Sequence, residues 1–113
     1  MVVVGRQRLW YHLGMKSRVF LQVDPASLHL PGSRMDGADP MKLQRQVAKH
    51  GTSTEGMPPL DVKRGTDGEF VIYDGVTRAT RLAKYLPGTP ITVEVTGELT
   101  RPVGGLPKVG DKL

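Results

Sequence analysis

Apolar and polar residues alternate most regularly in "ITVEV" (Ile91–Val95). Its three aliphatic residues point to one side of an extended chain, and Thr92 and Glu94 point to the other, which is the period of a half-buried strand. A second segment, "RVFLQV" (Arg18–Val23), is rich in aliphatic and aromatic residues and also predicts a strand. These segments are the first and last strands that the sequence predicts.

Two further apolar runs flank a turn signal in the middle of the chain. "PPLDVKRG" (Pro58–Gly65) and "EFVIY" (Glu69–Tyr73) are separated by "TDG" (Thr66–Gly68). An Asp-Gly pair tolerates the positive φ angles that tight turns between antiparallel strands need. The segment therefore predicts a β-hairpin.

Two other segments carry apolar residues at helical spacing. The first runs from Pro40 to His50, after Asp39, which can cap the free N–H groups, and before Gly51, which can end the helix in a left-handed conformation. The second runs from Thr77 to Leu86, where the aliphatic residues fall on one face. The sequence predicts a helix over each segment.

The order strand, helix, hairpin, helix, strand predicts an α+β fold with a small mixed sheet and two main helices. Three regions follow from this order: a basic N-terminal arm at residues 1–17, a folded domain at 18–98, and a Gly/Pro-rich C-terminal tail at 99–113. We expect the tail to fray or to wrap over the surface.

The composition narrows the class of protein. A chain of 113 residues with 38% hydrophobic residues supports one modest core. It has no cysteine, which excludes disulfides and thiol chemistry. No apolar run is long enough to span a membrane, and the opening "MVVVGRQRLWYHLG" lacks the pattern of a signal peptide. We therefore expect a cytoplasmic protein.

The net charge of +5 is spread unevenly. Residues 1–23 carry Arg6, Arg8, Lys16 and Arg18 without any acidic residue. Such an arm could contact nucleic acid or another polyanion. The favoured interpretation is a terminal arm whose charges only aid solubility, because the cations are not densely clustered.

The strongest candidate site lies in "YDGVTRATRLAKYLPG" (residues 73–88). A helix N-terminus presents unpaired N–H groups and a partial positive charge, and Gly75 just before it allows close approach of a ligand. Arg78 and Arg81 could add charge-assisted hydrogen bonds, and Thr77 could cap the helix or donate its hydroxyl. Asp74 would repel an anion unless it orients the corner. The pattern predicts a phosphate site.

These residues also have structural interpretations. Gly75 can serve only as a turn, and Asp74 can cap the helix or complete that turn. Arg78 and Arg81 can lie solvated or paired with acids. The sequence leaves both interpretations open, and they are compatible for Gly75.

Other candidate chemistry is weak. The three histidines, His12, His29 and His50, do not have the spacing of metal ligands, so we predict no metal site. No Ser/His/Asp pattern supports nucleophilic catalysis. The polar loop "SRMD" (Ser33–Asp36) could close over a ligand, although an ordinary surface loop is the favoured interpretation.

The order of these motifs resembles the ParB/sulfiredoxin-like domain family, also called the ParB-like nuclease domain. The matching pieces are "PPLDV", "DGEFVIYDG", "GVTR" and "PGTPITVEV", and the resemblance covers about residues 18–96. The family corner reads G-E-R-R in ParB proteins, which bind CTP there, and G-C-H-R in sulfiredoxin, which binds ATP. Gly75 and Arg78 match both patterns, whereas Val76 and Thr77 depart from them. The resemblance implies a nucleotide, CTP or ATP with Mg²⁺, as a possible cofactor.

These departures shape the functional hypotheses. Without cysteine, sulfiredoxin activity is excluded, and without the glutamate, ParB-style hydrolysis lacks support. The leading hypothesis is a module that binds a phosphate group, from a nucleotide or a nucleic-acid backbone, at Gly75, Thr77, Arg78 and Arg81. One alternative is a non-catalytic interaction or immunity-type protein that forms a homodimer or binds a partner through its terminal segments. Another is a weak metal-dependent nuclease, which needs a second carboxylate beside Asp74. The sequence favours binding over catalysis.

Overall fold

The computed structural model describes residues 18–113. This part of the chain forms four strands, two α-helices and three short 3-10 turns, which confirms the predicted α+β class with a small mixed sheet. The elements are β1 (Val19–Val23), η1 (Pro25–Ser27), η2 (Gly32–Arg34), α2 (Pro40–His50), β2 (Leu60–Arg64), β3 (Phe70–Asp74), α3 (Val76–Tyr85), β4 (Ile91–Glu98) and η3 (Val109–Lys112). The predicted basic arm, residues 1–17, lies outside the described residues.

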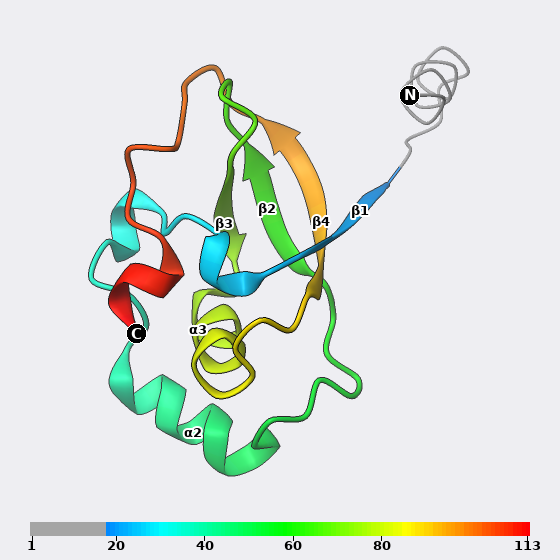
Figure 1. The fold of residues 1–113 in the computed structure, drawn as a ribbon, viewed down its shortest axis with the longest axis vertical. Helices are drawn as coiled ribbons and strands as arrows, with labels where there is room; N and C mark the ends of the chain where they lie inside the picture. Colours follow the sequence, from blue (N-terminus) through cyan, green and yellow to red (C-terminus); the bar gives the residue numbers. More distant parts are fainter. Residues whose placement is uncertain (1–17) are drawn as a thin grey trace.

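The strands form one sheet in the order β1-β4-β2-β3 (Figure 1). β1 pairs with β4 and β2 pairs with β3 in antiparallel fashion, whereas β2 and β4 are parallel neighbours. The predicted hairpin is therefore present, and Gly68 in its turn has the expected positive φ of 79°. The parallel pair requires a crossover, which α3 provides between β3 and β4.

The core lies between the sheet and α3. Alternate strand residues such as Leu60, Val62 and Val93 are fully buried, and α3 covers them with Ala79 and Leu82. Each such leucine or valine stabilises the fold by about 1.5–3 kcal/mol. α2 packs outside α3 and buries none of its residues completely (Figure 1). The molecule therefore has three layers: sheet, α3 and α2.

The bounds of α2 agree with the prediction. The carboxylate of Asp39 accepts a hydrogen bond of 2.9 Å from the N–H of Met41, and Gly51 ends the helix with a φ of 56°. α3 begins one residue before the predicted Thr77, at Val76, and β4 continues past Val95 to Glu98. None of the helices within residues 18–113 has the length and apolar character needed to cross a bilayer.

Residues 99–113 do not fray: as the alternative expectation held, the segment wraps over the domain, and two of its residues also complete the core. Val103 and Val109 are each 1% exposed. The N–H of Val109 donates to the carbonyl of Leu28 at 2.9 Å, and the N–H of Leu30 donates to the carbonyl of Pro107 at 2.8 Å. A spacing of six does not fit a helix, and the strand alternation that it would allow is broken by Gly105 and Pro107 between the two valines, so pattern analysis could not find this packing.

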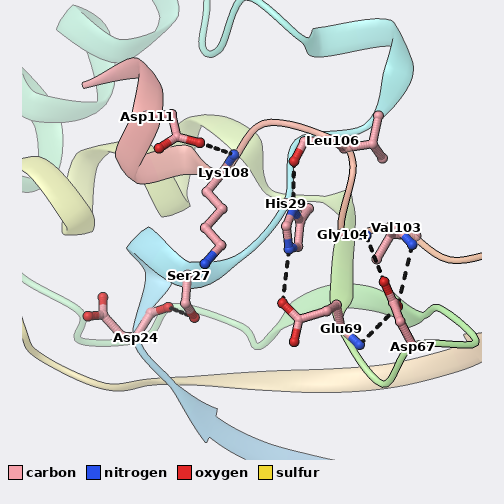
Figure 2. A network of polar contacts seen from close by, with 10 residues as sticks. All are labelled: Asp24, Ser27, His29, Asp67, Glu69, Val103, Gly104, Leu106, Lys108 and Asp111. Atoms are coloured by element: carbon pink, nitrogen blue, oxygen red, sulfur yellow. Dashed lines mark hydrogen bonds and ion pairs between the residues drawn. The ribbon is translucent and has the colours of Figure 1, made fainter.

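Polar contacts hold the same segment at two further places (Figure 2). The buried ring of His29 lies between the carbonyl of Leu106, 2.8 Å from Nδ1, and a carboxylate oxygen of Glu69, 3.1 Å from Nε2. The carboxylate of Asp67 accepts hydrogen bonds from the N–H groups of Gly104 and Val103, at 2.8 and 3.4 Å. The C-terminal segment is thereby tied to the hairpin turn and to residues 28–30.

Candidate functional site

Gly75 alone connects β3 to α3. Its φ of 118° lies in the left-handed region that favours glycine. A Cβ atom at this position would lie 2.7 Å from Cγ of Leu60 on β2. The packing of Leu60 therefore leaves no room for a side chain at position 75. This packing is a structural reason for Gly75, while its backbone also lines a cleft at this corner, so close approach of a ligand there stays a prediction. Gly75 acts by turning the chain into α3.

The N-terminus of α3 is not capped by any side chain. Neither Thr77 nor Asp74 makes the capping bond that the sequence allowed, and the first turn contains no acidic residue. The first N–H groups of an α-helix have no partner inside the helix. The N–H groups of Val76 and Thr77 are therefore available as donors beside the corner. The positive end of the helix dipole lies at the same place.

A cleft of about 470 Å³ lies at this corner. One wall is formed by the end of β3 and the first turn of α3, including Asp74, Thr77 and Arg78. The rest of the lining comes from residues 31–34 and from Lys42 and Gln46 of α2. The volume falls within the range of about 300–1,000 Å³ that small-molecule sites occupy. The helix N-terminus thus borders a concave site.

Three cations and one acid line the cleft. The cations are Arg34, Lys42 and Arg78, and the acid is Asp74. Sequence reasoning missed Arg34 and Lys42 as site residues. Arg34 belongs to the loop Ser33–Asp36, for which ligand contact was an open interpretation, so a signal existed. The sequence around Lys42 contains no feature that predicts contact with a ligand, because only the packing of α2 against α3 turns this residue toward the corner.

Arg78 is held in position from two sides. Its Nη1 donates to the carbonyl of Pro58 at 2.9 Å, and its Nη2 lies 3.8 Å from a carboxylate oxygen of Asp74. The side chain of Arg78 is 18% exposed, whereas that of Asp74 is 80% exposed. An ion pair with so exposed a partner contributes about 0–1 kcal/mol. The guanidinium is therefore oriented by Pro58, and Asp74 is easily displaced from it.

No protein-family model matches this sequence, and no curated protein matches it. The resemblance to the ParB/sulfiredoxin-like family therefore stays a prediction.

Arg81 does not belong to the cleft, contrary to the prediction. It is 2% exposed, and its Nη1 donates to the carbonyls of Gly51 and Ser53, each at 2.9 Å. Burial, and to a lesser extent the positive charge of Arg78, lowers the pKa of Arg81. Its guanidinium instead binds the backbone of the segment between α2 and β2 and holds that segment against α3. Helical spacing did not distinguish this role from that of Arg78.

A second carboxylate does lie near Asp74. Asp61 on β2 is its direct partner in the sheet register, but the carboxylate of Asp61 accepts a hydrogen bond from the hydroxyl of Thr96 on β4. Within residues 18–113, no group of three or more His, Asp or Glu side chains is arranged to hold a metal ion. The nuclease alternative gains one neighbouring acid and no metal-binding cluster in this part of the chain.

Proposed function

We propose that the cleft at the start of α3 binds a phosphate group. The single observation that supports this most is an uncapped helix N-terminus that opens into a cleft with three cations. Together with Asp74, these side chains carry a net charge of about +2 at neutral pH, which suits a phosphate dianion. Binding, without any chemical step, is the function that this arrangement supports.

Each group has a distinct role in the proposed site. The N–H groups of Val76 and Thr77 donate to phosphate oxygens, and the Thr77 hydroxyl adds a further donor. Arg78 donates through Nη2 while Nη1 keeps its bond to Pro58, so its fork is preorganised. Arg34 and Lys42 contribute charge from the η2 segment and from α2. The ligand displaces the carboxylate of Asp74 from the guanidinium of Arg78.

The resemblance to ParB/sulfiredoxin-like domains points to the same corner. "GVTR" (Gly75–Arg78) spans the junction of β3 and α3, where that family places its phosphate-binding motif. We propose that the chain has this fold and binds a nucleotide, such as CTP or ATP with Mg²⁺, or a nucleic-acid phosphate. Val76 occupies the position of the family's glutamate or cysteine, which supports a binding role over catalysis.

Amide chemical shifts provide the test. We expect inorganic phosphate, CTP, ATP or short DNA to shift the amides of residues 75–78 in the ¹⁵N spectrum. Lys42→Gln should weaken the binding by at least about 10-fold, because a charge-assisted hydrogen bond contributes about 1.5–3 kcal/mol. Lys84→Gln removes the same charge from α3 outside the cleft and serves as the matched control. Lys42 is exposed, so its variant should fold normally.

Two outcomes would count against the proposal. If none of the four ligands shifts residues 75–78, the cleft does not bind phosphate. If Lys84→Gln weakens binding as much as Lys42→Gln, the attraction comes from net charge and not from this site.

The interaction-protein alternative loses part of its basis. It rested on Gly/Pro-rich ends that could pack against a second chain, but residues 99–113 pack into their own core. Measurement of the mass in solution still separates the two functions. An obligate dimer that is indifferent to phosphate would favour the alternative.

A further inference from the structure

The two helices carry positive charge and no negative charge. α2 contains Lys42, Arg45 and Lys49, and neither α2 nor α3 contains an aspartate or glutamate. The two helices are distant in sequence but pack against each other (Figure 1). Cations that are scattered along the chain are thereby gathered on the helical side of the molecule.

The α2 cations form a stripe that runs into the cleft. At about 100° per residue, Lys42, Arg45 and Lys49 fall within an arc of about 60° on the helix surface. All three are exposed. Lys42 also lines the cleft, together with Arg34 and Arg78. The stripe and the cleft therefore form one continuous basic surface, which consists of Arg34, Lys42, Arg45, Lys49 and Arg78.

Most cations of this surface form no ion pair. Within residues 18–113 the ion pairs involve Arg18, His29, Arg64 and Arg78, and none involves the other four members of the basic surface. Four carboxylates lie on segments that border it. Asp39 is engaged in capping α2, and Asp74 is the exposed partner of Arg78. Asp36 follows Arg34 by two residues, and Glu55 lines a second pocket together with Arg78. Four of the five cations thus keep their donors available to a ligand.

We propose that the basic surface binds the phosphate backbone of duplex nucleic acid, with one phosphate in the cleft and its neighbours along α2. This inference rests on the proposed function, since the cleft supplies the first phosphate site. From Lys42 to Lys49 the helix rises by about 10 Å, which, measured along the axis of a duplex, corresponds to about three base-pair steps. A mononucleotide would occupy only the cleft, so the stripe favours a longer ligand.

The chemistry of the stripe favours a duplex over a single strand. Proteins that hold single strands combine charge with aromatic rings on which unpaired bases stack. α2 has no Phe, Tyr or Trp residue, and Tyr73, the aromatic residue that lines the cleft, has the ammonium of Lys63 over its ring at 4.6 Å. Cations without a stacking platform suit a backbone whose bases are already stacked, and contacts of this kind carry no sequence information.

Anisotropy of a labelled 20-base-pair duplex tests the inference at several salt concentrations. The double variant Arg45→Gln/Lys49→Gln removes two stripe cations outside the cleft. We expect it to weaken duplex binding at least 10-fold and to lower the salt slope by about 1.8, because each lost phosphate contact contributes about 0.9. The shifts that inorganic phosphate causes at residues 75–78 should stay unchanged.

The double variant Lys84→Gln/Arg101→Gln is the matched control, since it removes the same charge at two exposed positions that are not part of the basic surface. Equal weakening by both double variants, with phosphate still bound at residues 75–78, would overturn the inference and leave the proposed function intact. If inorganic phosphate causes no amide shifts at residues 75–78 of the unaltered protein, both the proposed function and this inference are wrong. Equal affinity for a single strand, for polyglutamate or for anionic vesicles would overturn the assignment to duplex nucleic acid.

Discussion

Arg78 and Arg81 lie on neighbouring turns of α3 and have nearly opposite surroundings. Three residues advance a helix by about 300°, so the two side chains leave the helix only about 60° apart. That difference places Arg78 at the edge of the cleft and Arg81 beneath the connector at residues 51–57. Arg78 keeps donors available to a ligand, whereas Arg81 uses its donors on backbone carbonyls.

The role of Arg81 can be tested by Arg81→Met, which keeps the length of the side chain and removes its donors. We expect the free energy of unfolding to fall by about 2 kcal/mol, because the carbonyls of Gly51 and Ser53 lose a charged donor. Urea unfolding measures this change. Hydrogen exchange should accelerate at residues 51–57, and Lys84→Met, an exposed change on the same helix, is the control.

An increase in the free energy of unfolding of Arg81→Met would also have a physical cause. A buried guanidinium without a carboxylate partner costs desolvation energy, and an apolar replacement can stabilise a protein. A more stable Arg81→Met variant with unchanged exchange at residues 51–57 would contradict the fastening role. Phosphate binding in the cleft should persist in either case.

At the scale of elements, the turn of the β2–β3 hairpin does more than reverse the chain. Asp67 at this turn accepts hydrogen bonds from the N–H groups of Gly104 and Val103 and also from Glu69, at 3.2 Å (Figure 2). Desolvation raises the pKa of Asp67, but these hydrogen bonds, with that of Gly104 the largest, together lower it below the usual value. The ionised carboxylate therefore joins the hairpin to the C-terminal segment.

A lowered pKa makes stability depend on pH in a definite direction. The contribution of Asp67 is present above the unfolded-state pKa of about 3.9 and is lost as the pH falls through the lower native pKa. We expect Asp67→Asn to be less stable than the unaltered protein at about pH 7, with a difference that shrinks toward about pH 2.5. Urea unfolding at both values measures it.

The same pH range contains a second group, which serves as a reference. The hydrogen bond from Arg18 lowers the pKa of Glu94, so the unaltered protein loses both contributions on acidification. Comparison of Asp67→Asn with Glu94→Gln separates them. A stability difference for Asp67→Asn that stays constant with pH would contradict the role of the charge.

At the scale of the whole molecule, the core is built from both ends of the described chain. α3 lies in the centre, the sheet covers one side of it, and η1 and η3 contact it from another (Figure 1). Val109 of η3 reaches the same buried cluster as Leu28 and Leu82. The C-terminal segment is therefore part of the folding unit.

Val109→Ala tests this conclusion. Removal of two buried methyl groups should lower the free energy of unfolding by about 1.5–3 kcal/mol, through lost burial and the cavity that remains. Thermal or urea unfolding measures the loss. Leu113→Ala, at a half-exposed position four residues later, should cost less than about 0.5 kcal/mol. Equal effects of the two changes would mean that the segment does not stabilise the core.

Much of the fold could be predicted because its signals are local. The cap at Asp39, the stop at Gly51 and the Asp-Gly turn act within a few residues, and the alternation from Ile91 to Val95 reports burial of one face. The glycine corner before α3 was found for the same reason. Backbone preference and capping depend on near neighbours, so sequence order alone reveals them.

The composition of the cleft depends on residues that are distant in sequence. Lys42 and Arg78 line one cleft only because α2 packs on α3, and Arg81 is buried only because the connector passes over it. The sequence by itself determined the main elements, their order and the glycine corner before α3. Tertiary packing decided which cations face the cleft and that the C-terminal segment joins the core, because side-chain exposure depends on neighbours that the chain brings together only on folding.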